Sequence, residues 1–228
     1  MRTNLLWEVE DIHTRTFAKG ARTIGVTSPQ TKSDVSQLAK SLAKRCASSG
    51  QKSLLMKLSS ALKEAGITDK TTLIGKTTSG EEIYRSPEGY DVLALNPEKS
   101  DEPRFHNARD LQDMLKSELE GYEQIIVDLS KGPETNKAPL PGGSSAAACD
   151  AVVLVCESHS VTRKALETAV ESLAMNDAKI AGLVVNDQDA PTLGQEMLKE
   201  FSRMQWFLPK GIRDYIEKKS SNKKTERT

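Results

Sequence analysis

The sequence has few cysteines and few aromatic residues, and it contains no long hydrophobic run. Its three cysteines, Cys46, Cys149 and Cys156, show no metal-ligand spacing and cannot all pair in disulfides. We therefore expect buried thiols in a reducing compartment. No apolar run approaches the ~20 residues that span a bilayer, and no apolar segment follows a basic cluster near the start, as a signal peptide requires. These absences predict a cytoplasmic protein without direct membrane insertion.

An excess of basic residues is also missing. Lys and Arg together number 32, as do Asp and Glu, so the formal net charge is zero. A dedicated nucleic-acid-binding protein normally shows a basic excess, and we expect no nucleic-acid partner. What is present is the composition of a globular protein, with 37% hydrophobic and 28% charged residues. A length of 228 residues suits a sheet covered by helices on both faces.

Short apolar runs alternate with helical patterns along most of the chain. The predicted strands are 22–27, 53–56, 90–95, 124–129, 151–156 and 180–185, the predicted helices are 35–47, 111–119 and 161–175, and a loop is predicted over 130–145. Continuous apolar runs are typical of strands buried on both faces. The alternation predicts a doubly wound, mostly parallel α/β sheet flanked by helices on both faces. We expect a helical segment over 1–20, the α/β domain over 21–218 and a disordered charged tail over 219–228.

The first junction between a strand and a helix lies at residues 26–34, where an open α/β sheet binds ligands. A phosphate-binding loop, G-x-x-x-x-G-K-[ST], needs its glycines so that backbone N–H groups can wrap the phosphates. Lys32 and Ser33 keep the last pair of this motif, whereas Val26 and Thr31 stand at the two glycine positions. Asp34 complements the positive end of a helix but competes with an anion there. With Thr31 it has the spacing of a capping box, so the segment also fits a plain helix start.

Segments on both sides of this loop follow a recognisable order. They are 24–28, 32–33, 38–43, 90–97, 125–128, 149–155 and 182–186. In order and spacing they resemble the cytoplasmic ATPase domain of bacterial tyrosine kinases, the BY-kinases of capsule and exopolysaccharide synthesis, which are relatives of MinD and ParA. No single match is specific, and the shared order carries the resemblance. It implies a P-loop NTPase fold.

The resemblance also implies roles for individual residues. Thr31, Lys32 and Ser33 fall on the Walker A loop, Asp128 on the end of the Walker B strand, and Asn186 on the asparagine that contacts the adenine base. ATP or ADP with Mg²⁺, held by Ser33 and Asp128, is the ligand that such a site takes if it still works. From the residues alone, Asp128 fits a cap of the following turn equally well, and Asn186 fits the start of the next turn.

Several departures from the family pattern concern the chemistry. The family's second strand ends in a D-x-D motif that binds Mg²⁺, whereas this chain has Lys57-Leu58-Ser59. A lysine at a carboxylate position inverts the local charge, and Mg²⁺ needs oxygen ligands. Phosphoryl transfer depends on positioning and charge neutralisation, so losing glycines and carboxylates together removes most of the expected rate. The tyrosine cluster that these kinases phosphorylate in themselves is also absent.

Two functional hypotheses follow. The first is a catalytically impaired BY-kinase-like module, with no cofactor, metal or catalytic residue expected, that regulates or contacts proteins of exopolysaccharide or capsule biosynthesis or export. The resemblance implies a membrane partner of the polysaccharide co-polymerase type that recruits the chain to the inner face of the membrane. A homo-oligomer stays open, since residues 8–15 lack the spacing of the family's ring-forming motif. The alternative is an active ATP-dependent tyrosine kinase or MinD/ParA-like switch ATPase that uses Lys32, Ser33 and Asp128. A dinucleotide-dependent oxidoreductase is disfavoured, because no G-x-G-x-x-G follows the first strand.

Overall fold

The structure is a computed structural model that describes residues 4–29, 34–58, 67–95, 108–129, 142–158 and 161–186. The chain divides into two units, Met1–Asn186 and Asp187–Thr228, and the second lies outside the described residues. The predicted tail at 219–228 lies there as well. The predicted domain boundaries therefore stay predictions.

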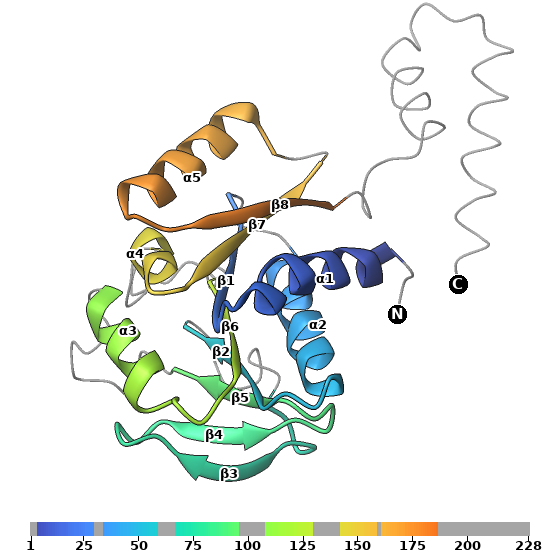
Figure 1. Cartoon of the computed structure of the whole chain (residues 1–228), viewed down its shortest axis with the longest axis vertical. Helices are drawn as coiled ribbons and strands as arrows, with labels where there is room; N and C mark the ends of the chain where they lie inside the picture. The colour runs from blue at the N-terminus through green and yellow to red at the C-terminus, as the bar shows by residue number, and fades with distance from the viewer. Residues whose placement is uncertain are drawn as a thin grey trace, which may run out of the picture. The chain divides into compact units, whose positions relative to one another are not determined.

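The first unit contains alternating strands and helices (Figure 1). The helices are α1 (Asn4–Arg15), the 3-10 turn η1 (Phe17–Lys19), α2 (Val35–Ser48), α3 (Ala108–Ser117), α4 (Gly142–Ala147) and α5 (Arg163–Met175). The strands are β1 (Thr23–Thr27), β2 (Ser53–Lys57), β3 (Thr72–Lys76), β4 (Glu82–Arg85), β5 (Asp91–Ala94), β6 (Gln124–Asp128), β7 (Ala151–Glu157) and β8 (Ile180–Asn186).

The strands form one eight-stranded sheet in the order β3-β4-β5-β2-β6-β1-β7-β8. The pairs from β5 to β8 in this order are parallel, and β4 pairs antiparallel with both β3 and β5. The predicted doubly wound, mostly parallel sheet is confirmed. From β1 the chain first adds strands on the side of β2 and later adds β7 and β8 on the other side. The carboxyl ends of the central strands β1 and β6 therefore form the switch point at which such sheets bind ligands.

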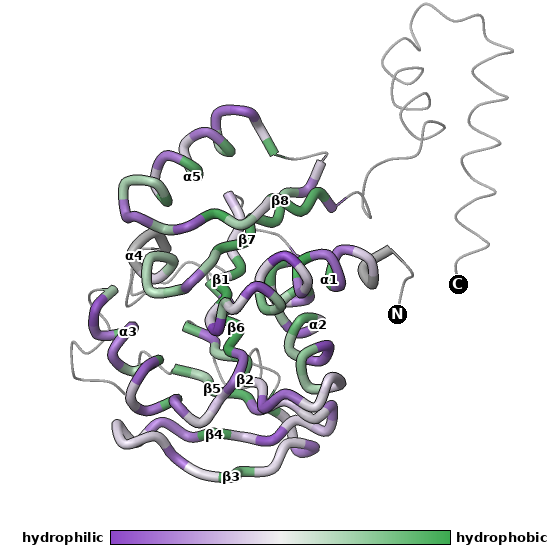
Figure 2. The backbone as a smooth tube through the Cα atoms, in the orientation of Figure 1, coloured by the Kyte–Doolittle hydropathy of each residue, from purple (hydrophilic) through white to green (hydrophobic). Residues whose placement is uncertain are grey.

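Helices cover both faces of the sheet and close two hydrophobic cores. One core lies between the sheet and α1 and α2, and the other contains buried side chains of α3 and α4 (Figure 1). The central strands appear as the apolar middle of the unit in Figure 2. Six side chains of α2 are buried, at the spacing that the sequence predicts: Val35, Leu38, Ala39, Leu42, Ala43 and Cys46. This apolar stripe fixes α2 against the sheet and so fixes the position of its first turn.

Two glycines explain local details of the packing. Gly50 has a φ of 80°, the left-handed conformation that glycine adopts after a helix, which confirms the predicted end of α2. Gly25 lies in the middle of β1, where an added Cβ would stand 2.8 Å from Leu129 Cδ1 and 3.2 Å from Cys149 Sγ. A larger residue at position 25 would therefore force the neighbouring core apart.

Two features differ from the prediction. The hairpin of β3 and β4 extends the sheet, although no strand was expected between 57 and 90. Every residue of β3 is exposed, so its sequence lacks the apolar pattern of the central strands. The predicted loop over 130–145 is also wrong at its end, because α4 begins at Gly142. The six-residue helix GGSSAA has neither the length nor the apolar periodicity that a sequence pattern can detect.

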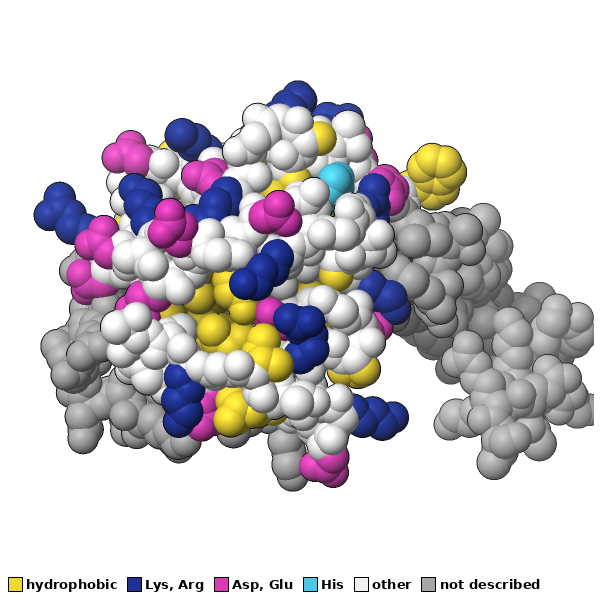
Figure 3. Space-filling model, turned by 60° about the horizontal axis from the view of Figure 1, so that its bottom comes forward, with side chains coloured by type: hydrophobic (Ala, Val, Ile, Leu, Met, Phe, Trp, Pro, Cys, Tyr) yellow, Lys and Arg dark blue, Asp and Glu magenta, His cyan; other side chains and the backbone are white. Residues whose placement is uncertain are grey.

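The surface carries charges of both signs. The face that contains the β3–β4 end of the sheet carries acidic and basic side chains side by side around a small apolar area (Figure 3).

Cys46, Cys149 and Cys156 are free and buried, as predicted. Burial raises the pKa of the Cys46 and Cys149 thiols to about 12, so neither is a thiolate at neutral pH. Among the described helices, none combines the length and hydropathy needed to cross a bilayer.

Candidate functional site

The candidate site lies at the carboxyl ends of β2 and β6. These neighbouring parallel strands end on Lys57 and Asp128, which are partners in the strand register. β1 adjoins β6 on its other side, with Val26 opposite Asp128. α2 begins at Val35, directly after the segment that contains the predicted phosphate loop. The fold thus brings the second strand, the sixth strand and the start of α2 to one place.

Three side chains from these elements contact one another. Lys57 Nζ lies 3.2 Å from Asp128 Oδ2 and donates a hydrogen bond of 3.1 Å to Ser36 Oγ. The Ser36 hydroxyl in turn donates to Asp128 Oδ2 at 2.6 Å. Lys57 and Asp128 are buried, with 4% and 2% of their surface exposed. We call these three residues the Lys57 triad. The ammonium and the carboxylate offset each other's charge here, and the hydroxyl bonds to both.

This arrangement does not fit a magnesium ion. Mg²⁺ is bound by oxygen ligands, usually carboxylates and water, whereas the described donors here are one carboxylate and one hydroxyl beside an ammonium. A divalent cation 4 Å from that ammonium would be repelled by about 8 kcal/mol at an effective dielectric constant of about 20. Within the described residues, no group of three or more His, Cys, Asp or Glu side chains could hold a metal ion.

A second polar contact joins β8 to the start of α2. The Asn186 side-chain amide donates a hydrogen bond to Asp34 Oδ2. Asp34 is the residue before the first turn of α2, yet its side chain makes no capping hydrogen bond. Its carboxylate accepts a hydrogen bond from the end of β8 instead. The capping box predicted for Thr31 and Asp34 stays a prediction, because Thr31 lies outside the described residues. The predicted role of Asn186 in contacting an adenine base stays a prediction.

The predicted site residues have different outcomes. Thr31, Lys32 and Ser33 lie outside the described residues. Asp128 and Asn186 both lie at carboxyl ends of strands, each bonded to a residue at the start of α2.

Ser36 is a site residue that was not predicted from the sequence. The motif drew attention to Ser33, but Ser36 is the hydroxyl that contacts Asp128. Its only sequence signal is that it lies beside Val35, the first member of the buried stripe of α2.

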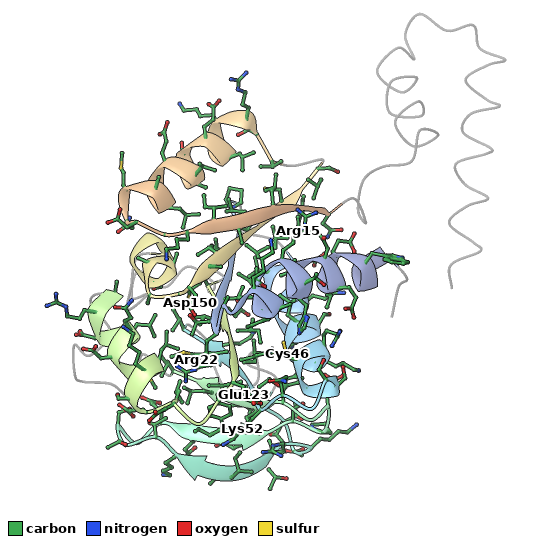
Figure 4. All side chains as sticks on the ribbon, in the orientation of Figure 1. Arg15, Arg22, Cys46, Lys52, Glu123 and Asp150 are labelled. Atoms are coloured by element: carbon green, nitrogen blue, oxygen red, sulfur yellow. The ribbon has the colours of Figure 1, made fainter. Side chains whose placement is uncertain are left out.

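The opposite, amino end of the sheet holds a different polar network, whose members Arg22 and Asp150 are labelled in Figure 4. Asp150 Oδ2 accepts hydrogen bonds from the N–H of Arg22 at 2.9 Å, the N–H of Thr23 at 2.8 Å and the Thr23 hydroxyl at 2.8 Å. Burial alone would raise the pKa of Asp150, but these donors outweigh it and lower the pKa below its usual value of 3.8. This network joins β7 to β1 and has a structural role.

Comparison with known proteins supports the fold. No family model and no curated protein matches the sequence. Among solved structures, the kinase domain of the Escherichia coli tyrosine kinase ETK is 18% identical, with a TM-score of 0.60 over 82% of this chain and 76% of that one. MinD from Aquifex aeolicus is 14% identical, with a TM-score of 0.55 over 79% and 73%.

A third structure contains ligands. Cobyrinic acid a,c-diamide synthase from Mycobacterium smegmatis, with bound ADP and magnesium, is 13% identical, with a TM-score of 0.54 over 80% of this chain and 82% of that one. The resemblance inferred from the sequence is thus confirmed at the level of the fold. The chain has the α/β P-loop NTPase fold that a bacterial tyrosine kinase domain and MinD share.

Proposed function

We propose that the chain is a catalytically impaired BY-kinase-like protein that acts as a regulatory or interaction module in bacterial exopolysaccharide or capsule biosynthesis or export. The observation that carries this proposal is the ion pair between Lys57 and Asp128. It places an ammonium where catalysis needs a divalent cation. The carboxylate beside it is the group that would otherwise help to hold that cation. The missing loop glycines at Val26 and Thr31 support the same conclusion.

The resemblance of the sequence to BY-kinases, together with the likeness in fold to a tyrosine kinase domain, supports the following setting for this module. The protein acts in the cytoplasm, and a membrane protein of the polysaccharide co-polymerase type recruits it to the inner face of the membrane. It contributes a folded surface rather than phosphoryl transfer. Neither ATP nor Mg²⁺ is needed for that role.

The test is a magnesium-dependent ATP turnover and tyrosine phosphorylation assay on the full chain. We expect no turnover above that of the Lys32→Ala variant, because both proteins lack the metal site. Magnesium-dependent ATP turnover by the wild-type chain that Lys32→Ala abolishes would contradict the proposal. In a host strain from which the gene is deleted, Lys32→Ala should restore polymer production as well as the wild-type chain does. Failure of that variant alone would show that the loop lysine acts chemically.

One observation favours an active ATP-dependent kinase or switch ATPase instead. Asp128 stands at the end of β6, where a Walker B aspartate belongs, and Lys32-Ser33 precede α2 in the sequence. This alternative requires ATP or ADP to bind with Mg²⁺. Calorimetry distinguishes the two proposals, since no heat of binding at millimolar nucleotide with Mg²⁺ eliminates the alternative.

A further inference from the structure

The Lys57 triad joins charged and polar groups from three elements. The Ser36 hydroxyl accepts a hydrogen bond from Lys57 and donates one to Asp128. Asp128 Oδ2 also forms an ion pair with the Lys57 ammonium, at 3.2 Å. Lys57 comes from β2, Asp128 from β6 and Ser36 from α2. The contact is almost closed to solvent, because the side chains of Lys57 and Asp128 are only 5% and 1% exposed.

We propose that the Lys57 ammonium permanently takes the place of a divalent cation at this position and holds α2 against β2 and β6 without metal or nucleotide. This inference rests on the proposed function and deepens it. A bound ion would bridge a carboxylate of the sheet and a hydroxyl of α2 only while it stayed bound. A tethered ammonium makes the same bridge at all times, because the lysine stem cannot diffuse away.

The contact between Asn186 and Asp34 completes the arrangement. It joins β8 to the residue before α2, so the start of α2 is held from two sides by side chains of this chain. The fold around the site is then fixed in one state. A protein of this kind presents the same surface whether or not nucleotide or magnesium is available, unlike a switch that changes state with its ligand.

The first test measures the thermal midpoint Tm of the full wild-type chain in EDTA and in 10 mM MgCl₂ at equal ionic strength. We expect the two Tm values to agree within about 1 °C, because a ligand that does not bind gives no stabilisation. A clear increase with Mg²⁺ would overturn the inference, since it would show a divalent cation binding despite the ammonium.

The second test removes the ammonium. Lys57→Ala should lower Tm by about 6–20 °C, the range for breaking a buried ion pair in a protein of this size. It also opens space beside Asp128. We expect 10 mM MgCl₂ to recover about 3–5 °C, if the ion binds with a Kd of about 1 mM, and n-propylammonium to recover Tm as well. Tetramethylammonium, which has charge but no N–H donor, should not.

Lys57→Met is the matched control, because its stem fills the space beside Asp128 and leaves no room for an added ion. It should lose Tm as Lys57→Ala does but gain nothing from Mg²⁺ or n-propylammonium. The inference is overturned if Lys57→Ala keeps the wild-type Tm, or if it loses Tm and neither cation restores any of it. If Lys57→Ala does not fold, the wild-type comparison still decides.

The outcomes also separate this inference from the proposed function. Turnover of ATP by the wild-type chain that Lys32→Ala abolishes defeats the proposed function and the inference with it. Stabilisation of the wild-type chain by Mg²⁺ without turnover defeats only the inference.

Discussion

The two ends of the sheet hold buried polar networks of different construction. At the amino end, Asp150 accepts two backbone N–H groups, and the Arg22 guanidinium donates to backbone carbonyl groups. At the carboxyl end, the Lys57 triad consists of side chains alone, drawn from β2, β6 and α2. The first network satisfies main-chain groups that would otherwise be left at the ends of elements. The second joins side chains of three elements to one another.

This difference bears on function. Polar groups at the amino end of a parallel sheet have a structural role, whereas those at the carboxyl end usually face a ligand. In this chain, side chains of Lys57, Ser36 and Asp128 bond to one another at that end. A buried charge without a partner is costly, so the ammonium of Lys57 stabilises the carboxylate of Asp128.

Removing the ammonium of Lys57 from the carboxyl-end network should have the largest effect on the free energy of unfolding. Lys57→Met keeps the stem and removes the ammonium, so the buried Asp128 carboxylate loses its ion pair with Lys57. The free energy of unfolding should fall by about 3–5 kcal/mol, measured by urea denaturation at pH 7. The double variant Lys57→Met/Asp128→Asn should recover much of this loss, because it buries no charge. A double variant as unstable as the single one would show that packing, not charge, explains the loss.

Breaking the amino-end network at its guanidinium should have the next largest effect. Arg22 donates to the carbonyls of Leu115 at 3.0 Å and Tyr122 at 2.9 Å and also to that of Leu119, so it caps the chain where α3 ends. Arg22→Met should cost about 2–3 kcal/mol in urea denaturation, with faster amide exchange near the end of α3. Lys52, whose ammonium lies 4.8 Å above the Tyr122 ring, is the control, and Lys52→Met should cost less than about 1 kcal/mol. Equal losses would contradict the capping role.

The sequence predicts the central strands well, but it predicts the β3–β4 hairpin and the site residues less completely. The apolar runs of β1, β6 and β7 predict buried parallel strands because their side chains face helices on both sides. β3 and β4 were not predicted, because strands at an exposed antiparallel edge have no such run. At the site, the position of Lys57 directly after the predicted strand 53–56 locates it correctly, at the end of β2. Ser36 was not predicted, because a hydroxyl in a helix gives no pattern of its own. Contacts between distant segments depend on strand order, which a single sequence does not encode locally.

Removing the hydroxyl from the Lys57 triad sharpens the comparison further. Ser36→Ala deletes the hydrogen bond to Asp128 but leaves the ion pair in place, so the loss should be about 1–2 kcal/mol in urea denaturation. Ser48, on the same helix, is the control. Its hydroxyl donates to the Arg45 carbonyl at an exposed position, and Ser48→Ala should change stability by less than about 0.5 kcal/mol. A Ser36→Ala loss as large as that of Lys57→Met would mean that the hydroxyl, not the ion pair, holds the three elements together.

The amino-end carboxylate should give the smallest effect and a characteristic pH dependence. Asp150→Asn keeps an acceptor oxygen but removes the charge that its donors favour, so we expect a loss of about 1 kcal/mol at pH 7, reduced by the partial exposure of the group.

Because the pKa of Asp150 is lowered from 3.8 in the folded protein, its contribution is fully present above pH 3.8 and disappears as the pH falls through the lower, folded-state value. Urea denaturation of both proteins between pH 7 and pH 2.5 should therefore show a constant difference that shrinks only below about pH 3.8. Asp11→Asn, which breaks an exposed ion pair with Arg15, should cost less than about 0.5 kcal/mol at pH 7. A difference between wild type and Asp150→Asn that persists undiminished at pH 2.5 would show that the carboxylate charge is not what joins β7 to β1.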